Sequence, residues 1–412
     1  MNIACFSHYF TPEIGAPSAR FHDMSRQWLS EGHSVDIITC FPNHPKGRVY
    51  PGYTQKRYQH EQIDGINVHR NWTYLATNTG FLKKTLGHFS LWPSAHFNSE
   101  KYLNKLDVTV GTSPTFFAAM AASGAARRRD IPFVMDVRDL WPAVFVELGV
   151  VKSRGVIRLL EKWELSLYRQ ATRIVTVTES FRSNLINRGV PASKVHTIPN
   201  GADTDYWLPK HGSSRLRNSL NLQDKFIALY IGAHGIAHAL GRIIEAADRI
   251  QHIKDIHFLF VGAGAEKSML IQQAKSLNLQ NVTFHDSVPK EKVADFYAMS
   301  DVCLVPLRDI PLFETFIPSK MFEIMSIERP IIGSVRGEAA DILNRSKAAV
   351  VVPPEDSKAI ADAVCTLRNN PNRRHVMGQN GRIFVKEHYS RKALAAKYIE
   401  VMREAIEEYK AK

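Results

Sequence analysis

The segment FIPSKMFEIMSIERP, residues 316–330, has the pattern of a loop that becomes a helix and stops before a strand. Pro318 and Ser319 suit a helix start, and apolar residues at positions 321, 322 and 325 form one stripe. Strands are expected on either side, at 302–306 and 330–333. The helix is therefore a crossover, and its N-terminus is expected at the carboxyl edge of a parallel sheet, where α/β folds bind ligands.

Two charged residues of this segment, Lys320 and Glu323, are three positions apart and so share one side of the helix. An ammonium group beside helix N–H groups favours a diphosphate, and a carboxylate one turn further in can accept hydrogen bonds from a ribose. The pair therefore indicates a nucleotide site. A solvated surface ion pair is the alternative.

The composition is that of a globular protein large enough for two domains, with 412 residues, 44% hydrophobic and 23% charged. Its four cysteines have no metal-ligand spacing, so we expect reduced core residues and no metal site. No export signal opens the chain and no apolar run is long enough to span a bilayer. We expect a cytoplasmic protein.

The net charge of +13 is concentrated in the first half, where residues 1–200 hold 24 Lys and Arg against 15 Asp and Glu. A basic face suits phosphorylated substrates or an anionic membrane, and without a nucleic-acid module we expect no nucleic acid as partner. Between Trp72 and Tyr102 aromatic and basic residues mix, as on a membrane-surface segment or a buried helix with snorkelling lysines. They are Phe81, Lys83, Lys84, His88, Phe89, Leu91, Trp92 and Phe97.

Strands and helices alternate in two successive series, which predicts two doubly wound, Rossmann-like α/β domains. The sharp turn IPNGAD, residues 198–203, separates them. We expect an N-terminal domain over 1–199 and a C-terminal domain over 200–389. A final helix, 390–412, must cover one domain or bridge both. Strands are expected at 3–10, 35–40, 66–70, 108–111, 133–137 and 174–178, then at 226–232, 258–262, 282–284, 302–306, 330–333 and 349–352.

The loop after the first strand offers Gly15, which lets a ligand approach the backbone, and Arg20, which opens a helix and can bind phosphate or carboxylate. A connecting loop with a surface arginine is the equal alternative.

A second polar group follows the strand at 133–137, where Asp136, Arg138, Asp139 and Trp141 stand close in sequence. Charges at a strand terminus are candidates for chemistry, Asp139 above all. An Asp–Arg pair that ties down a loop explains them equally well.

In the second series, glycine turns follow two strands, at Gly232–Gly235 and Gly262–Gly264. Such turns suit a diphosphate that approaches the backbone, and close packing of helix on strand explains them as often. Their convergence with Lys320 on one sheet edge strengthens the prediction of a nucleotide site.

The motifs FTPEIGAPSAR, VRDLWP, IPNGAD, VGAGAEK and PSKMFEIMSIERPII together resemble the retaining glycosyltransferases of family 4, over nearly the whole chain. VRDLWP and PSK further resemble the bacterial branch that transfers N-acetylfucosamine or related amino sugars in O-antigen and capsule synthesis. The resemblance implies the GT-B architecture, in which two domains face each other across a cleft and the last helix crosses back to the first.

The resemblance also implies roles for particular residues. Glu323 would hold the ribose, the Gly262–Gly264 turn and Val288 would flank the base, and Gly15 and Gly235 would meet the diphosphate of a UDP-sugar. The donor set is completed by His234, Pro318, Ser319 and Lys320. The N-terminal domain would bind a polyprenyl-diphosphate-linked acceptor at the inner-membrane surface, through Arg20, Asp136 and Trp141, and Asp139, Arg138 and Lys320 would be catalytic.

The chain departs from the family pattern at three places. Thr315 stands where many members have a glutamate, with Glu314 one position out of register. Residues 232–237, GAHGIA, replace an expected arginine and lysine, so that Lys320 and His234 must neutralise the diphosphate. Glu328 ends a helix where glycine is common, which predicts a strained cap.

These residues predict a metal-independent, retaining glycosyltransferase without cofactor, in which closure about residue 200 assembles the active site. A UDP-sugar 2-epimerase-like isomerase and a catalytically silent scaffold subunit are the alternatives.

Overall fold

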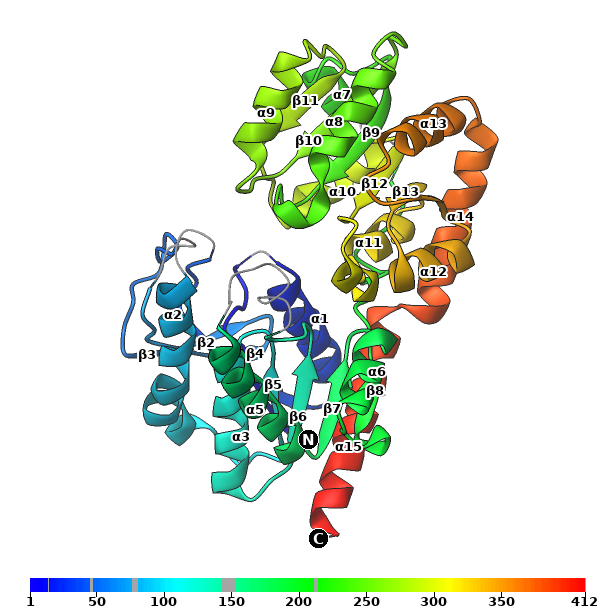
Figure 1. Cartoon of the computed structure of the whole chain (residues 1–412). Helices are drawn as coiled ribbons and strands as arrows, with labels where there is room; N and C mark the ends of the chain where they lie inside the picture. The colour runs from blue at the N-terminus through cyan, green and yellow to red at the C-terminus, as the bar shows by residue number, and fades with distance from the viewer. Residues whose placement is uncertain (14, 45–46, 76–80, 143–152, 211–213, 412) are drawn as a thin grey trace. The chain divides into compact units, whose positions relative to one another are not determined.

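The structure, a computed structural model, describes residues 1–13, 15–44, 47–75, 81–142, 153–210 and 214–411. They form two compact units (Figure 1). The first unit comprises residues 1–200 and 391–412, and the second comprises residues 201–390. The turn IPNGAD therefore contains the first crossing of the chain between units, and the second crossing immediately precedes the last helix.

The first unit is built on a sheet with the strand order β3-β4-β2-β1-β5-β6-β7-β8 in the described residues. All neighbours pair in parallel except β3 and β4, which form an antiparallel edge. Its elements are β1 (Asn2–Phe6), α1 (Ala16–Ser30), β2 (Ser34–Cys40), β3 (Tyr58–Ile63), β4 (Ile66–Asn71), α2 (Phe81–Ser94), β5 (Val108–Thr112), α3 (Phe116–Arg129), β6 (Phe133–Val137), α5 (Arg154–Gln170), β7 (Arg173–Thr176), α6 (Glu179–Asn187), β8 (Val195–Thr197) and α15 (Arg391–Lys410).

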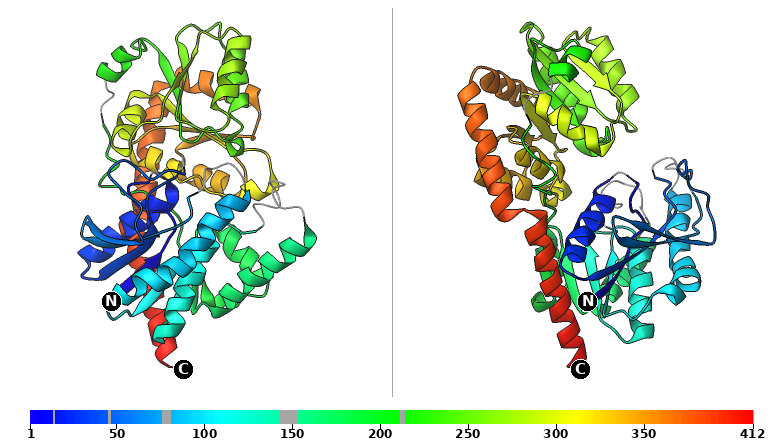
Figure 2. Two further views of the ribbon diagram at one scale, coloured as in Figure 1. Left: turned by 90° about the vertical axis from the view of Figure 1, so that its left-hand side faces the viewer. Right: turned by 180° about the vertical axis from the view of Figure 1, so that it is seen from behind.

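The last helix, α15, completes the first unit. Trp28 of α1 donates an indole hydrogen bond of 3.1 Å to the Ala395 carbonyl, and Asp23 of α1 pairs with Arg391. Helices α1 and α15 lie side by side on one face of the sheet, and α2 and α3 cover the other (Figure 2). One stripe of α15 faces the core, and each of its members is at most 2% exposed: Leu394, Ala395, Tyr398, Ile399 and Met402.

The second unit is a parallel sheet in the order β11-β10-β9-β12-β13-β14, with a hydrophobic core on each face. Its elements are α7 (Ser214–Ser219), β9 (Phe226–Ile231), α8 (Leu240–Arg249), β10 (Ile256–Val261), α9 (Lys267–Ser276), β11 (Val282–His285), α10 (Lys290–Met299), β12 (Val302–Pro306), α11 (Lys320–Ser326), β13 (Ile331–Ser334), α12 (Gly337–Ser346), β14 (Ala349–Val352), α13 (Ser357–Arg368) and α14 (Pro371–His388).

The strand order of the second unit reverses direction between β9 and β12, since successive crossovers run one way from β9 to β11 and the other way from β12 to β14. In open α/β sheets such a reversal leaves a crevice at the carboxyl ends of the two central strands, and ligands bind there. The residues that end these strands, Ile231 and Pro306, therefore mark the place to look for a site.

Two features differ from the expectation. The first strand ends at Phe6, four residues earlier than expected, and β3 and β8 are additional strands at the two edges of the sheet. Among the described residues, no helix combines the length and the apolarity needed to cross a bilayer.

Candidate active site

Lys320 opens α11 and points back to the carboxyl end of β9. Its Nζ donates a hydrogen bond of 2.9 Å to the Ile231 carbonyl and lies 4.2 Å from the centre of the Tyr230 ring. Burial lowers the pKa of Lys320 to about 8, against the opposing effect of Glu323. The ammonium group thus stays charged at neutral pH. The alternative of a solvated surface lysine is wrong, because a main-chain carbonyl and an aromatic ring hold this side chain.

Glu323 lies one turn further along α11 and is half-buried. Its Oε2 accepts a hydrogen bond of 3.2 Å from the hydroxyl of Tyr297, which is 1% exposed. The carboxylate is thereby held in place.

The glycine turns after β9 and β10 pack directly on one another. A Cβ on Gly262 would lie 1.9 Å from the Gly232 carbonyl oxygen, and one on Gly264 would lie 2.2 Å from the His234 carbonyl oxygen. Close packing of the two turns is therefore sufficient to explain Gly262 and Gly264, and their predicted place beside a nucleotide stays a prediction. Gly232 differs, because a Cβ there would lie 2.6 Å from Lys320 Nζ. Gly235 faces open space, with no described atom within 4 Å of an added Cβ.

His234 lies inside the turn, 0% exposed, beside the rings of Tyr230, Phe260 and Phe284. Burial, with smaller effects of Lys267 and Lys320, lowers its pKa to about 4. The ring is neutral at physiological pH. In this conformation His234 therefore carries no positive charge, and its predicted role at a diphosphate stays a prediction.

A second histidine, His238, was not predicted. It ends the 3₁₀ turn Ile236–His238, and its Nδ1 lies 3.3 Å from the carbonyl oxygen of Pro306, the last residue of β12. Its ring centre is 5.9 Å from that of Tyr230. Many family members have a lysine in this loop, and this chain does not. A search for another nitrogen-bearing side chain just beyond GAHGIA would have identified His238.

Three further predicted donor residues, Pro318, Ser319 and Val288, and the unusual Thr315 belong to the second unit. Pro318 and Ser319 precede α11, and their carbonyls accept hydrogen bonds from the Met321 and Phe322 amides. Val288 is half-buried against the core. Thr315 donates to the Leu312 carbonyl at 2.7 Å, so its hydroxyl has a structural partner.

In the first unit Arg20 is buried, at 2% exposure, and is not the surface arginine of the alternative. Its Nε donates to Asp136 Oδ2 at 3.2 Å, and its terminal nitrogens donate to the carbonyls of Ile198 and Pro199 and to Asn200 Oδ1. Asp136, 0% exposed, also accepts from the Tyr398 hydroxyl at 3.3 Å. These contacts favour a structural role for Arg20 and Asp136 over the predicted contact with an acceptor.

Arg138 and Asp139 follow β6 and differ from this pair. Arg138 is 8% exposed, and its Nε and Nη1 have no hydrogen-bond partner in the part of the chain that the structure describes. Burial lowers its pKa to about 10, so the charge persists. Burial raises the pKa of Asp139 to about 6, and Arg138 offsets part of this effect. A carboxyl that titrates near neutrality beside an unused guanidinium is suited to proton transfer or anion binding.

Trp141 and Gly15 are less suited to their predicted roles. Trp141 is 8% exposed and stacks on Phe116 with ring centres 4.7 Å apart, so it packs in the core. Gly15 precedes α1 in an extended conformation, at φ 160°, which any residue can adopt.

Two family models match the two halves of the chain. A model described as "Glycosyl transferase 4-like domain" matches residues 15–201, and one described as "Glycosyl transferases group 1" matches residues 213–384. The chain belongs to the GT-B glycosyltransferases.

Individual proteins agree with this assignment. A protein of Escherichia coli (strain K12) named as a colanic acid biosynthesis glycosyl transferase, WcaI, is 27% identical over 79% of this chain and 81% of its own length. Sucrose-phosphate synthase from Thermosynechococcus elongatus has a TM-score of 0.77 at 19% identity, covering 98% of both chains. Anabaena HepE in complex with UDP-glucose has a TM-score of 0.72 at 15% identity, covering 98% of this chain and 99% of its own. These structures confirm the two-domain GT-B fold.

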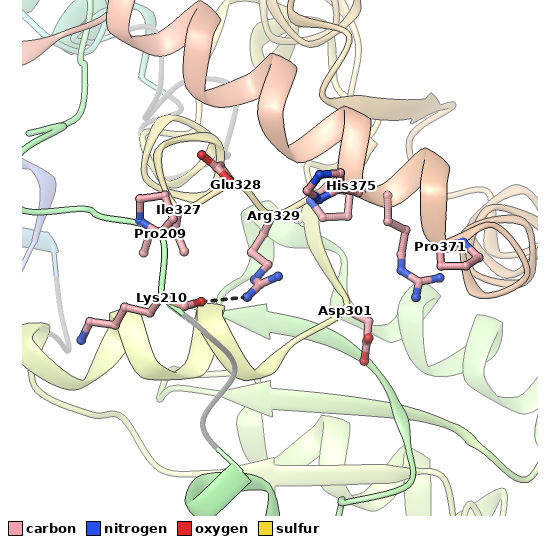
Figure 3. Close-up of a pocket in the computed structure, with 10 residues that line it drawn as sticks. Pro209, Lys210, Asp301, Ile327, Glu328, Arg329, Pro371 and His375 are labelled. Carbon is pink, nitrogen blue, oxygen red and sulfur yellow. Dashed lines mark hydrogen bonds between the residues drawn. The ribbon is translucent and has the colours of Figure 1, made fainter.

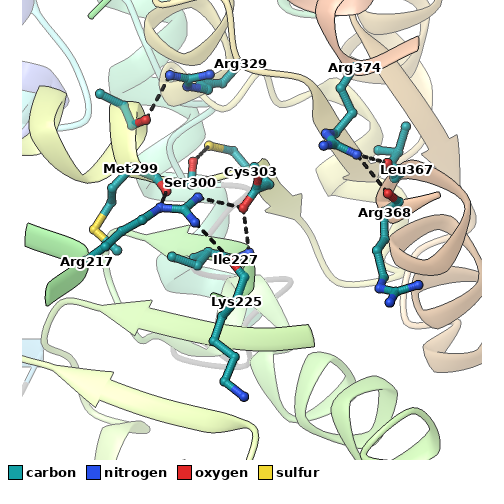
Figure 4. Close-up of polar contacts among 12 residues, drawn as sticks. Arg217, Lys225, Ile227, Met299, Ser300, Cys303, Arg329, Leu367, Arg368 and Arg374 are labelled. Atoms are coloured by element: carbon teal, nitrogen blue, oxygen red, sulfur yellow. Dashed lines mark hydrogen bonds and ion pairs between the residues drawn. The ribbon is translucent and has the colours of Figure 1, made fainter. Parts of the chain in front are cut away.

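The glycosyltransferase also has a cavity of about 460 Å³ in the second unit, at the amino ends of β12 and β13 (Figure 3). It lies at the opposite edge of the sheet from Lys320. Its arginines are already engaged, since Arg329 donates to the carbonyls of Lys210, Tyr297 and Ala298, and Arg374 donates to those of Leu367 and Arg368 (Figure 4). These arginines therefore connect neighbouring segments of the chain, and the cavity is poorly suited to binding an anion.

The aromatic segment of the first unit has both buried and exposed members. Leu91 is 0% exposed, whereas Leu86, Phe89 and Phe97 are 49%, 41% and 64% exposed. The side chains of Phe81 and Lys84 lie outside the described set. The glycosyltransferase thus has apolar surface near α2, and the buried-helix alternative accounts for only part of the segment.

Proposed function

We propose that this glycosyltransferase transfers a sugar from a UDP-sugar, bound by the second unit, with retention of anomeric configuration. The observation that carries the proposal is Lys320 Nζ, charged and anchored 2.9 Å from the Ile231 carbonyl at the point where the strand order reverses. Glu323 would accept hydrogen bonds from the ribose. HepE, a protein of the same fold, has been crystallised with UDP-glucose.

In the proposed reaction the bond between the anomeric carbon and the diphosphate oxygen breaks, and a bond to the acceptor oxygen forms on the same face. UDP leaves with its negative charge, and the acceptor hydroxyl loses its proton. Lys320 would stabilise the charge that develops on the diphosphate. We propose that this cation replaces a divalent metal, so chelators should leave the rate unchanged.

The acceptor in this proposal is a saccharide linked to polyprenyl diphosphate, bound by the first unit. The buried guanidinium of Arg138, with two nitrogens lacking partners among the described residues, would bind an anionic or hydroxyl group of the acceptor. Asp139 would orient the reacting hydroxyl. The likeness to a colanic acid enzyme supports bacterial surface-polysaccharide synthesis, with an N-acetylated sugar such as N-acetylfucosamine as the proposed donor sugar.

A lipid-linked acceptor requires contact with the cytoplasmic face of the inner membrane. The exposed Phe89 and Phe97 near the basic α2 support peripheral binding, because aromatic rings favour the interface and lysines favour anionic headgroups. Anionic vesicles should therefore retain the protein, and Phe89→Ser with Phe97→Ser should release it.

The central test measures binding and turnover of a UDP-sugar panel by Lys320→Ala. Loss of a charge-assisted contact should weaken donor binding by ~10- to 100-fold. Lys275→Ala, on the exposed side of α9, is the control that should bind normally. Unchanged donor affinity in Lys320→Ala would exclude the role. Epimerised sugar without acceptor would indicate an isomerase, and binding without any turnover would indicate a scaffold subunit.

A further inference from the structure

The two central strands of the second unit each end at a carbonyl that holds a nitrogen-bearing side chain. Ile231, the last residue of β9, accepts from Lys320 Nζ at 2.9 Å. Pro306, the last residue of β12, lies 3.3 Å from His238 Nδ1. Because β9 and β12 are paired parallel neighbours, the carbonyls that hold Lys320 and His238 lie at the same edge of the sheet, at the ends of adjacent strands.

Lys320 and His238 both lie near the ring of Tyr230. Its ring centre lies 4.2 Å from Lys320 Nζ and 5.9 Å from the centre of the His238 ring. The tyrosine is 0% exposed and its hydroxyl donates to the Ala233 carbonyl at 2.6 Å, so the ring is fixed. Gly235, at the start of the turn that carries His238, borders open space.

The contact with Pro306 determines the chemistry of the imidazole. A carbonyl oxygen only accepts hydrogen bonds, so Nδ1 carries the hydrogen and the neutral ring has its lone pair on Nε2. Protonation at Nε2 leaves the bond to Pro306 intact and creates a second donor. The ring can therefore change charge without changing position.

Lys320 is the charged side chain that acts most strongly on His238. Burial lowers the pKa of His238 to about 4, Lys320 adds to this effect, and the hydrogen bond to the Pro306 carbonyl opposes it. Of the other nearby charges, Arg308 lies 3.7 Å from Glu355, and Lys267 lies 2.7 Å from Asp286. Glu323 is on α11 with Lys320. An anion placed against Lys320 would replace repulsion by attraction, which favours the protonated ring.

We propose that His238 is a second anion-binding group of the donor site and that it takes up a proton from solvent when a nucleoside diphosphate sugar binds. The ring would then donate through Nε2 to the diphosphate while Nδ1 holds the Pro306 carbonyl. This inference rests on the proposed function, because it requires that the second unit bind a nucleotide sugar. It predicts that donor affinity falls as pH rises from about 4 toward the higher pKa of His238 in the complex, and levels off above that pKa.

The test is titration calorimetry of the full chain with UDP-glucose and with GDP-mannose, whose diphosphates have no titrating terminal phosphate. At pH 7, in buffers of different ionisation enthalpy, the wild type should take up ~0.5–1 proton, and affinity should fall by up to about tenfold per pH unit between about pH 5 and pH 7, where Lys320 stays charged. His238→Gln should take up no proton and bind more weakly. His238→Lys should recover affinity without proton uptake.

The matched control is His257→Gln at the amino end of β10. His257 is 7% exposed, its pKa is also lowered to about 4 by burial, and it contacts Thr283 at 2.9 Å, away from Lys320. This variant should take up protons like the wild type. Binding without proton uptake, or uptake that persists in His238→Gln, would overturn the inference and leave the donor site standing. Absence of binding by these two nucleotide sugars and by every member of the UDP-sugar panel would refute the donor site itself.

Discussion

Replacing Asp139 with asparagine should change stability in a pH-dependent way. Burial raises the pKa of Asp139 from its ordinary 3.8 to about 6. Between these values the folded state holds a proton that the unfolded state has released, so this group makes the free energy of unfolding fall as pH rises. A separation of about 2 pH units corresponds to on the order of 3 kcal/mol, fully lost above about pH 6.

Asp139→Asn has no such loss, so its stability relative to the wild type should grow by about 3 kcal/mol between about pH 4 and pH 7. Any pH-independent cost of leaving Arg138 without its neighbour cancels in this comparison. Urea unfolding followed by tryptophan fluorescence measures it, because every tryptophan except Trp207 belongs to the first unit.

The exposed Glu31→Gln is the matched control in the same unit. Sugar transfer by Asp139→Asn should fall while its stability at pH 7 rises. A stability difference that stays constant with pH would refute the reasoning, since the carboxyl would then titrate alike in the folded and unfolded states.

Three further substitutions test the structural contacts. Arg20→Met removes the ion pair with the buried Asp136 and should lower the free energy of unfolding by ~3–5 kcal/mol in urea titrations. A loss below ~1 kcal/mol would contradict a stabilising role for this ion pair. Gly262 has φ 146°, and Gly262→Ala places a Cβ 1.9 Å from the Gly232 carbonyl oxygen. Thermal unfolding should therefore occur at a lower temperature, and donor binding should be lost. An unchanged melting temperature would show that the two turns separate easily. Glu328→Gly relieves a left-handed residue at φ 60° and should stabilise by ~0.5–1 kcal/mol, and destabilisation would mean that its 3.7 Å contact with Arg382 outweighs the strain.

The sequence predicts best those elements whose pattern is local. β6, β12 and β14 have the expected bounds because each is a short apolar run between turn residues. α3 escapes such reasoning, since its small residues are buried nearly all round and leave no polar face to define a stripe. α14 contains Gly378 and Gly381, which read as helix breakers, yet a Cβ on Gly378 would lie 2.3 Å from the Glu328 carbonyl. Its glycines serve tertiary packing that the sequence does not display.

The candidate site shows the same division. Lys320 could be predicted because its helix, its strand neighbours and its charge all lie within one segment. His238 and Arg20 could not be assigned, because their partners are remote: Pro306 is 68 positions from His238, and Ile198 is 178 positions from Arg20. Each histidine or arginine looks alike in sequence, and only the fold tells which is a packed core residue and which borders a crevice.

The discontinuity of the first unit has a consequence for biosynthesis. A ribosome must make all of residues 201–390 before α15 emerges to seat Ala395 against Trp28. Until then the nascent amino-terminal lobe keeps an apolar groove uncovered, which invites chaperone binding or aggregation. Deletion of α15 should therefore impair folding of the first unit, while the second unit still folds.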